Sequence, residues 1–208
     1  MEQHKIIIIG YAGHSYVVND IYLSNNKQVG FYCDSEEKKE NPYNLQYLGK
    51  ENEVIDKLKQ SEFFIAIGDN NIREKVFLNL EKNNVLPINA IHNNTIISSS
   101  ATINPNGVMV SAGAIINAFA NIGKGVIINT GAIIEHECSI GDFAHIAPGA
   151  VLCGNVTVGK NSFVGAGSVV KQGIKIGDNV IIGAGSVVVK DVPDEKKNNG
   201  KPCKINFY

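Results

Sequence analysis

An aliphatic residue recurs every six positions through the C-terminal half of the chain, and no other feature of the sequence restricts the fold so strongly. Twelve consecutive positions keep this spacing without a slip: Ile122, Ile128, Ile134, Ile140, Ile146, Leu152, Val158, Val164, Val170, Ile176, Ile182 and Val188. A small or β-branched residue, such as Ala132 or Ser162, often follows four positions later. An α-helix has a period of 3.6 and a strand a period of 2, whereas a hexapeptide repeat is typical of a parallel β-helix.

Each repeat predicts one flat face, and three faces make one triangular coil of about eighteen residues. The aliphatic side chains then point inward and stack on their equivalents one coil away, while small residues allow tight corners. Upstream, Ile97, Ile103, Met109 and Ile115 keep the same period, and one extra residue separates them from Ile122. We therefore expect these four side chains to point inward as well.

The first half of the chain has a different pattern, in which short apolar runs alternate with helical spacing. The run Ile6–Ile9 ends at Gly10 and predicts a strand that is buried on both faces. Further strands are predicted at 28–32 and 63–67, and helices around 17–22, 54–58 and 72–80. This alternation is typical of a small parallel sheet with flanking helices. We expect an α/β, Rossmann-like domain over residues 1–90 and the β-helix domain over residues 91–208.

The composition favours an ordered chain with a packed core and does not favour a nucleic-acid partner. Hydrophobic residues make up 44% of the chain, and 19 basic residues nearly balance 20 acidic ones, for a net charge of −1. The four cysteines lie far apart and form no CxxC pair, which favours reduced thiols over a disulfide framework or a zinc site. The apolar run Ile6–Ile9 is too short for a signal peptide or a membrane span, so we expect a cytoplasmic protein.

A glycine-containing turn follows the first predicted strand and opens the first predicted helix. Gly10 and Gly13 frame it, and His14 comes directly after. It lacks the full GxGxxG pattern, which disfavours a nicotinamide dinucleotide, but a diphosphate fits the N-terminus of such a helix. Asp34 lies just past the second strand, where acidic residues contact a ribose or a base. The alternative is that the two glycines only form a tight turn.

Titratable residues are rare in the repeats except between positions 135 and 145, which hold two histidines and three carboxylates. Transfer of an acyl group from a thioester to an amine needs a general base, a donor to the oxyanion and a groove for the thioester. His136 follows an inward aliphatic by two positions, so its side chain can project outward and act as the base. The alternatives are a solvated surface histidine at this position, and Cys138 as a nucleophile.

The segment His136-Glu137-Cys138, followed by Ile140-Gly141-Asp142-Phe143 and His145, resembles the active-site segment of the bacterial sugar O-/N-acyltransferases. The turn at 10–14 and the segment 63–73 are similar to that family too, so the resemblance spans nearly the whole chain. The family includes sialic acid O-acetyltransferases and UDP-4-amino-sugar N-acetyltransferases of protein glycosylation, and the bacillosamine-type enzymes are the nearest. It implies a left-handed β-helix and a homotrimer with active sites between subunits.

The resemblance also implies a role for particular residues. His136 becomes the general base on the sugar amine, and Glu137 supports it. The residues implied for acetyl-CoA binding are His145, Gly154, Ala166, Gly167 and Gly185. Those implied for nucleotide-sugar binding are Gly10, Gly13, His14, Asp34, Gly68, Asp69 and Asn70. Asn129 is a weaker candidate for a contact near the sugar. The tail at 200–204 is similar to the ending of the family, except at Lys201 and Cys203.

The implied function is acetyl-CoA-dependent N-acetylation of the 4-amino group of a UDP-linked amino-dideoxy sugar, without a metal. Alternatives within acyl transfer are O-acetylation of sialic acid or another sugar hydroxyl, and N-acetylation of a GDP- or dTDP-linked amino sugar. A zinc carbonic anhydrase on a β-helix needs three histidine ligands, and the repeats supply only His136 and His145. A non-catalytic scaffold is the remaining alternative. His136 and His145 lie half a coil apart, so a reaction that uses both needs a subunit interface.

Overall fold

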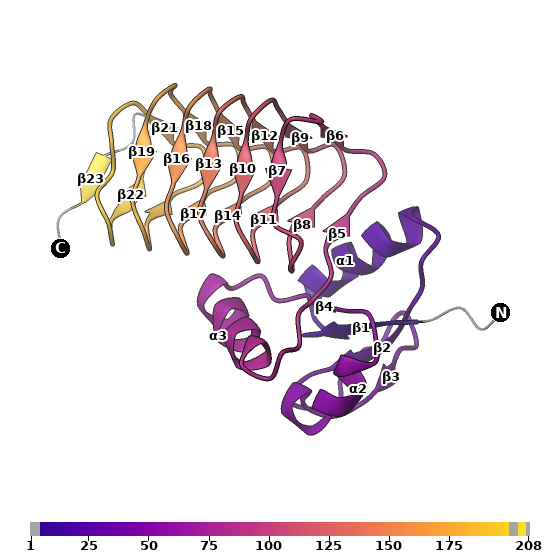
Figure 1. Cartoon of the computed structure of the whole chain (residues 1–208). Coiled ribbons are helices and arrows are strands. Elements are labelled where there is room, and N and C mark those ends of the chain that lie inside the picture. Colours follow the sequence, from indigo (N-terminus) through magenta and orange to yellow (C-terminus); the bar gives the residue numbers. More distant parts are fainter. Residues whose placement is uncertain (1–4, 200–203, 207–208) are drawn as a thin grey trace.

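The structure is a computed structural model that describes residues 5–199 and 204–206, with side chains over 5–196. The tail motif predicted at 200–204 lies outside these residues except for the backbone of Lys204. Figure 1 shows two parts, an α/β domain at the N-terminus and a coiled prism of short strands that carries the rest of the chain. No helix in the described part of the chain is long and apolar enough to cross a bilayer.

The N-terminal domain is built on a four-stranded parallel sheet in the order β3-β2-β1-β4. Its strands are β1 (Ile6–Ile9), β2 (Val29–Cys33), β3 (Gln46–Tyr47) and β4 (Phe63–Ile65). Its helices are α1 (Gly13–Ser24), α2 (Ile55–Lys59) and α3 (Asn70–Glu81), with a 3-10 helix at Glu51–Glu53. The predicted strands and helices are therefore confirmed. The two-residue β3 was not predicted, because its side chains are not buried and carry no apolar pattern.

Side chains of β1 alternate between two apolar cores, one on each side of this sheet. Ile6 and Ile8 pack with Val18 and Ile21 of α1. Ile7 and Ile9 pack instead in the cluster that holds Leu58 of α2 and Phe77 of α3. Because both faces are covered, all four isoleucines are buried, which explains the continuous apolar run in the sequence.

The C-terminal part is a left-handed parallel β-helix with three sheets, in which strands from β5 to β22 pair in parallel one coil apart, while β23 pairs antiparallel with β22. Ile128, for example, pairs with Ile146, which pairs with Val164. The strands are β5 (Ala90–Ile91), β6 (Ile96–Ile97), β7 (Thr102–Ile103), β8 (Met109–Val110), β9 (Ile115–Ile116), β10 (Asn121–Ile122), β11 (Ile127–Ile128), β12 (Ile133–Ile134), β13 (Ser139–Ile140), β14 (His145–Ile146), β15 (Val151–Leu152), β16 (Thr157–Val158), β17 (Phe163–Val164), β18 (Val169–Val170), β19 (Lys175–Ile176), β20 (Ile181–Ile182), β21 (Val187–Val188), β22 (Lys197–Asn199) and β23 (Lys204–Asn206).

The twelve aliphatic residues of the unbroken repeat fill the interior of the prism together with small corner residues such as Ala132 and Ala144. The predicted register is wrong in the first coils. Val110 and Ile116 are fully buried in this core, in place of Met109 and Ile115. The extra residue therefore lies in the longer turn between Ile103 and Val110, and not before Ile122. Both β8 and β9 carry two adjacent apolar residues, so spacing alone left two registers open.

Met109 points out of the prism because it belongs to the contact with the N-terminal domain. It packs with Ala90 and Ile127 in the same cluster as Tyr22 of α1. The sheet that contains β5, β8, β11, β14 and β17 thus faces the N-terminal domain, which Figure 1 shows against the early coils. On the other flank of the contact, Phe77 of α3 meets Phe143 edge-on, with ring centroids 5.2 Å apart.

Candidate functional site

The carboxyl ends of β1 and β4 lie side by side and open toward the β-helix. From β1, the chain adds β2 and β3 on one side of the parallel sheet and β4 on the other side. The point between β1 and β4, where the order of strands switches, is where open parallel sheets bind ligands. Gly10 follows β1 with a φ of +89°, and a Cβ there would lie 2.7 Å from Ile67 Cγ1. Glycine is therefore required at position 10 both by its backbone conformation and by the close loop after β4.

His14 lies in the first turn of α1 and contacts the loop after β4. A Cβ added to Gly68 would be 3.6 Å from the His14 ring, while nothing lies within 4 Å of a Cβ at Gly13. The sequence assigned Gly13, His14 and Gly68 to the nucleotide sugar. The structure brings these three residues together at one edge of the sheet.

His145 comes from the β-helix and faces His14 across the contact between the domains. Only 8% of its surface is exposed. Its Nε2 atom lies 3.1 Å from Asn129 Nδ2, and its ring centroid is 5.0 Å from that of Phe163 and 6.3 Å from that of His14. We call the site formed by His14, Gly68, Asn129 and His145 the interdomain seam.

Both imidazoles of the seam are held in the neutral state. Burial, followed by the positive charge of Arg73, lowers the pKa of His145 to about 3 and that of His14 to about 4. Two of their nitrogens, His14 Nε2 and His145 Nδ1, are buried and have no hydrogen-bond partner among the described residues. Because buried polar atoms are normally paired, two unpaired nitrogens in one contact mark the seam as a candidate site.

Beside the seam, the loop after β4 and the outer face of the β-helix line an open pocket of about 260 Å³. Its lining residues are Gly68, Asp69, Asn70, Asn71, Asn161, Phe163 and Ile181. Asp69 caps α3 by accepting a hydrogen bond from the amide of Ile72, and Asn70 donates to the carbonyl of Asn161 at 2.8 Å. Asn161 and Phe163 were missed by the sequence analysis, because only the fold brings them to this loop.

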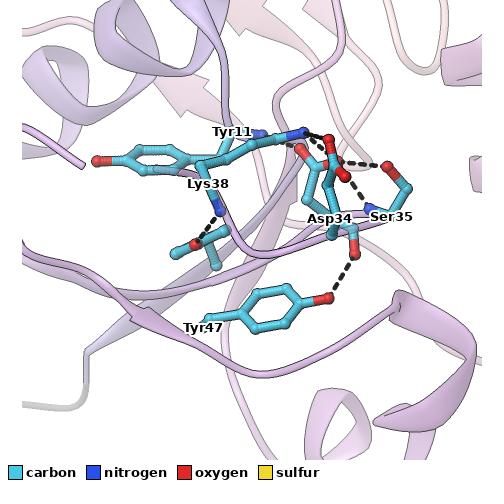
Figure 2. Close-up of polar contacts among 7 residues, drawn as sticks. Tyr11, Asp34, Ser35, Lys38 and Tyr47 are labelled. Atoms are coloured by element: carbon cyan, nitrogen blue, oxygen red, sulfur yellow. Dashed lines mark hydrogen bonds and ion pairs between the residues drawn. The ribbon is translucent and has the colours of Figure 1, made fainter. Parts of the chain in front are cut away.

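Asp34 closes the turn after β1. Its carboxylate accepts hydrogen bonds from the amides of Tyr11 and Ser35, at 2.9 and 2.7 Å, and pairs with Lys38 Nζ at 3.0 Å (Figure 2). Burial raises the pKa of this carboxyl, but the Tyr11 amide and the Lys38 ammonium bring it below its usual range. Asp34 is thus an ionised group at the edge where the nucleotide is predicted. The sequence analysis missed Lys38, which lies in a loop without a recognisable motif.

His136 and Glu137 lie at a corner of the prism between β12 and β13, away from the seam of the same chain. His136 Nδ1 is 3.1 Å from Glu137 Oε2, and 51% of the His136 side chain is exposed. Glu137 has a φ of +61°, a conformation that non-glycine residues adopt at a cost. When Nδ1 donates its proton to Glu137, the lone pair of Nε2 is free to accept a proton.

Gly154 provides the space that the His136 ring occupies. A Cβ at this position would lie 2.4 Å from His136 Cε1. The equivalent corner positions one coil before and after these two residues are Ala118 and Gln172. Of these four corner residues, Ala118, His136, Gly154 and Gln172, Gly154 is the one against which the His136 ring packs. Its absence of a side chain is therefore explained by His136.

Ala166, Gly167 and Gly185 form a strip along another corner of the prism, between β17 and β18 and between β20 and β21. Ala166 and Gly167 are exposed. The amides of Gly167 and Gly185 donate to the carbonyls of Pro148 and Ala166, so the coil ladder already uses them. The structure thus separates Gly154 from Ala166, Gly167 and Gly185, while His145, the fifth residue that the sequence assigned to acetyl-CoA, lies in the seam.

Cys138 is unsuited to act as a nucleophile. Its side chain is 1% exposed within the core of the prism, and its Sγ donates to the carbonyl of Cys153 at 3.3 Å. Burial raises the pKa of this thiol, which opposes formation of the reactive thiolate. Within the described residues, no group of three histidine, cysteine, aspartate or glutamate side chains is arranged to hold a metal ion.

Three family models match the chain. Residues 5–80 match the PglD N-terminal domain. Residues 119–154 and 137–172 match the bacterial transferase hexapeptide, and residues 155–190 match the hexapeptide repeat of succinyl-transferase. Together these models cover the parallel sheet with its helices and most of the β-helix.

Solved structures of sugar-modifying enzymes are similar to the chain over nearly its whole length. One is a variant of perosamine N-acetyltransferase from Caulobacter crescentus in complex with CoA and GDP-perosamine, with 35% identity, coverage of 98% of this chain and 97% of that chain, and a TM-score of 0.92. Another is the acetyltransferase domain of PglB from Neisseria gonorrhoeae in complex with acetyl coenzyme A, with 30% identity, coverage of 98% and 100%, and a TM-score of 0.89. WeeI from Acinetobacter baumannii is 25% identical, with coverage of 97% and 99% and a TM-score of 0.83.

Proposed function

Because this chain belongs to the bacterial sugar acyltransferases that join a PglD N-terminal domain to hexapeptide repeats, we propose that it transfers the acetyl group of acetyl-CoA to the 4-amino group of a nucleotide-linked amino sugar. The observation that carries this proposal is the His136–Glu137 pair, an exposed imidazole oriented by a carboxylate on an otherwise unreactive corner. The PglB domain and the perosamine enzyme support it, since their structures hold acetyl coenzyme A and CoA with GDP-perosamine, respectively.

In the proposed reaction the amine attacks the thioester directly. His136 Nε2 removes a proton from the amine as its nitrogen bonds to the acetyl carbon, and Glu137 stabilises the imidazolium that forms. The tetrahedral intermediate then collapses, the carbon–sulfur bond breaks, and CoA leaves as the thiol after taking up the proton. No acyl-enzyme forms, in accordance with the burial of Cys138.

The active site in this proposal is shared between subunits of a homotrimer. Within one chain, the corner with His136 is separate from the seam with His14 and His145. In the trimer, the His136 corner of one subunit therefore lies against the seam of the next subunit, and the two together form one active site. Residues 1–90 bind the nucleotide sugar through the loops at 10–14, 34 and 68–70. Residues 91–208 bind acetyl-CoA along the exposed strip that contains Ala166 and Gly167. The reaction takes place in the cytoplasm, where both substrates are available, and supplies an acetamido sugar for glycan synthesis.

A panel of sugar nucleotides tests this function and identifies the nucleotide. Purified protein and acetyl-CoA are incubated with UDP-, GDP- and dTDP-linked 4-amino sugars, with the matching 4-hydroxy sugars, and with sialic acid, and free thiol is followed. The sequence favours UDP, whereas the perosamine enzyme makes a GDP-linked sugar a specific second candidate. We expect thiol release with an amino sugar and an N-acetyl product by NMR. Release only with hydroxyl acceptors would contradict the proposal.

Replacement of Gly154 by alanine tests whether the position of the His136 ring matters for catalysis. The added methyl group would overlap the imidazole, so the ring must turn away from Glu137. We expect kcat to fall by about 10²-fold, the effect of a misplacement of about 1 Å, while the KM for each substrate changes little. The control is Gln172→Ala, which lies one coil further at the same corner and is exposed. An unchanged kcat in Gly154→Ala would show that the ring position does not matter.

A further inference from the structure

Arg73 is the largest fully buried side chain of the described residues and is 1% exposed. It comes from the first turn of α3 and reaches into the contact between the two domains. Burial lowers its pKa to about 9, and the nearby Asp69 raises it, so the guanidinium stays charged at neutral pH. Side chains of this kind are almost never fully buried unless a charge partner is present.

All five N–H groups of this guanidinium are used, and every acceptor is a neutral oxygen. On the side of the N-terminal domain, Nη1 donates to the carbonyls of Ile67 and Gly68, and Nη2 donates to Asn70 Oδ1. On the side of the β-helix, Nε donates to the carbonyl of Gly125 at 2.8 Å, and Nη2 donates to that of Phe143 at 2.7 Å. Arg73 forms no ion pair within the part of the chain that the structure describes.

A buried charge without a direct ion pair is costly, and simpler contacts already join the domains here. Phe77 packs on Phe143 one turn further along α3, and Lys124 pairs with Glu81 at 2.9 Å at the rim. Asn70 also joins the loop at 67–70 to the β-helix, but only to the coil at 161–162. Among the described residues, Arg73 connects this loop to two successive coils through one rigid planar group.

The two ends of this connection are next to the two histidines of the seam. Gly68 is packed against the His14 ring, and Phe143 precedes His145 by two residues. The charge of Arg73 also contributes, after burial, to the lowered pKa of both imidazoles. Its position and its charge therefore act on the same pair of side chains.

We propose that Arg73 is a positioning residue for acetyl transfer, which fixes the nucleotide-sugar loop at 67–70 relative to His145. This inference rests on the proposed function, because it takes that loop to hold the nucleotide sugar. Arg73 does not touch the substrate. It acts through the carbonyl groups that it holds in place on both sides of the seam.

Replacement of Arg73 by lysine is the direct test, with the sugar nucleotide that the wild-type protein acetylates. Lysine keeps the charge, but its three donors cannot hold five acceptors on two sides. We expect the KM for the sugar nucleotide to rise by about tenfold or more and kcat to fall, because reacting groups are misplaced. The KM for acetyl-CoA should change less than that for the sugar nucleotide, because Arg73 holds the loop at 67–70 directly and reaches His145 only through the backbone of Phe143.

Phe77→Leu is the matched control, because it weakens the same contact between the domains without removing a hydrogen bond. It should lower the thermal midpoint and leave both KM values unchanged. If Arg73→Lys behaves like this control, with both KM values unchanged and activity reduced only with the folded fraction, Arg73 is merely structural and the proposal fails. If the wild-type protein acetylates no sugar nucleotide, the proposed function fails instead.

If Arg73→Lys does not fold, hydrogen exchange on the wild-type protein tests whether Arg73 couples the loop at 67–70 to the β-helix. The sugar nucleotide acetylated in the panel is added without acetyl-CoA. We expect slower amide exchange in the peptides that contain Gly125 and Phe143, which Arg73 connects to the loop at 67–70. Unchanged exchange in these peptides, together with slower exchange in the loop, would overturn the proposal.

Discussion

Replacement of His136 by alanine is expected to lower kcat by about 10²–10⁴-fold, the usual contribution of a general base. The KM values should change little, because the imidazole acts on the proton of the amine and not on binding. The fold should be retained, because half of the side chain is exposed and its ring only covers Gly154. Steady-state kinetics measure kcat and KM, and circular dichroism checks the fold.

His92→Ala is the control for this experiment. His92 lies just after β5, and its Nδ1 accepts a hydrogen bond from the amide of Asn94. It takes no part in the proposed site, so its loss should leave kcat unchanged. Turnover by His136→Ala at the wild-type rate would remove the assigned base. It would leave the fold and the family of the chain as they are.

Acid should destabilise the protein through the two imidazoles of the seam. The pKa of His145 is lowered to about 3 and that of His14 to about 4, by burial first and then by Arg73. The unfolded chain therefore binds protons at these sites below about pH 6.5, whereas the folded chain does not. The contribution of these two histidines to the free energy of unfolding is fully present above about pH 6.5. It is lost as the pH falls toward their pKa values in the folded chain, at about 1.4 kcal/mol per pH unit for each histidine.

His145→Asn isolates one of these contributions, because asparagine takes up no proton. Urea unfolding is followed by circular dichroism between about pH 6 and pH 4. The free energy of unfolding of the wild-type protein should fall more steeply than that of the variant, by about 1.4 kcal/mol per pH unit. Phe163→Leu serves as the control for lost packing against the His145 ring. It should lower stability at every pH and keep the wild-type slope, and equal slopes for wild-type and His145→Asn would contradict the account.

Much of the fold could be predicted, because its repeats are local in the sequence. The spacing from Ile122 to Val188 sets the register of strands that pair one coil apart, and each inward side chain contacts its own equivalent. The predicted register was wrong at Met109 and Ile115, where the six-residue spacing does not determine which of two adjacent apolar residues points inward. There the adjacent residue is also apolar, and the outward Met109 is buried by the N-terminal domain. A periodicity in one chain segment cannot indicate which outward residue a separate domain will cover.

The candidate site was predictable only where its residues are neighbours in sequence. His136 and Glu137 are consecutive, and their contact follows from a tight corner. The seam joins positions 14, 68, 129 and 145, whose proximity depends on how α1 and α3 dock against the β-helix. Arg73 was not singled out from the sequence, although it ends the segment 63–73 that resembles the family, since an arginine on an amphipathic helix is most often solvated. Its importance becomes visible only from its burial and its five acceptors.

Complementation between two inactive variants tests most directly the central claim that two subunits build each active site. Chains with His136→Ala and chains with His145→Ala are co-expressed with different tags, and assemblies that carry both tags are purified. Each variant alone is expected to be nearly inactive. Each mixed trimer contains one site of three that pairs an intact His136 corner with an intact His145 seam, so activity should return to about a third of the wild-type level. Mixed assemblies that stay as inactive as their parents would contradict the shared site.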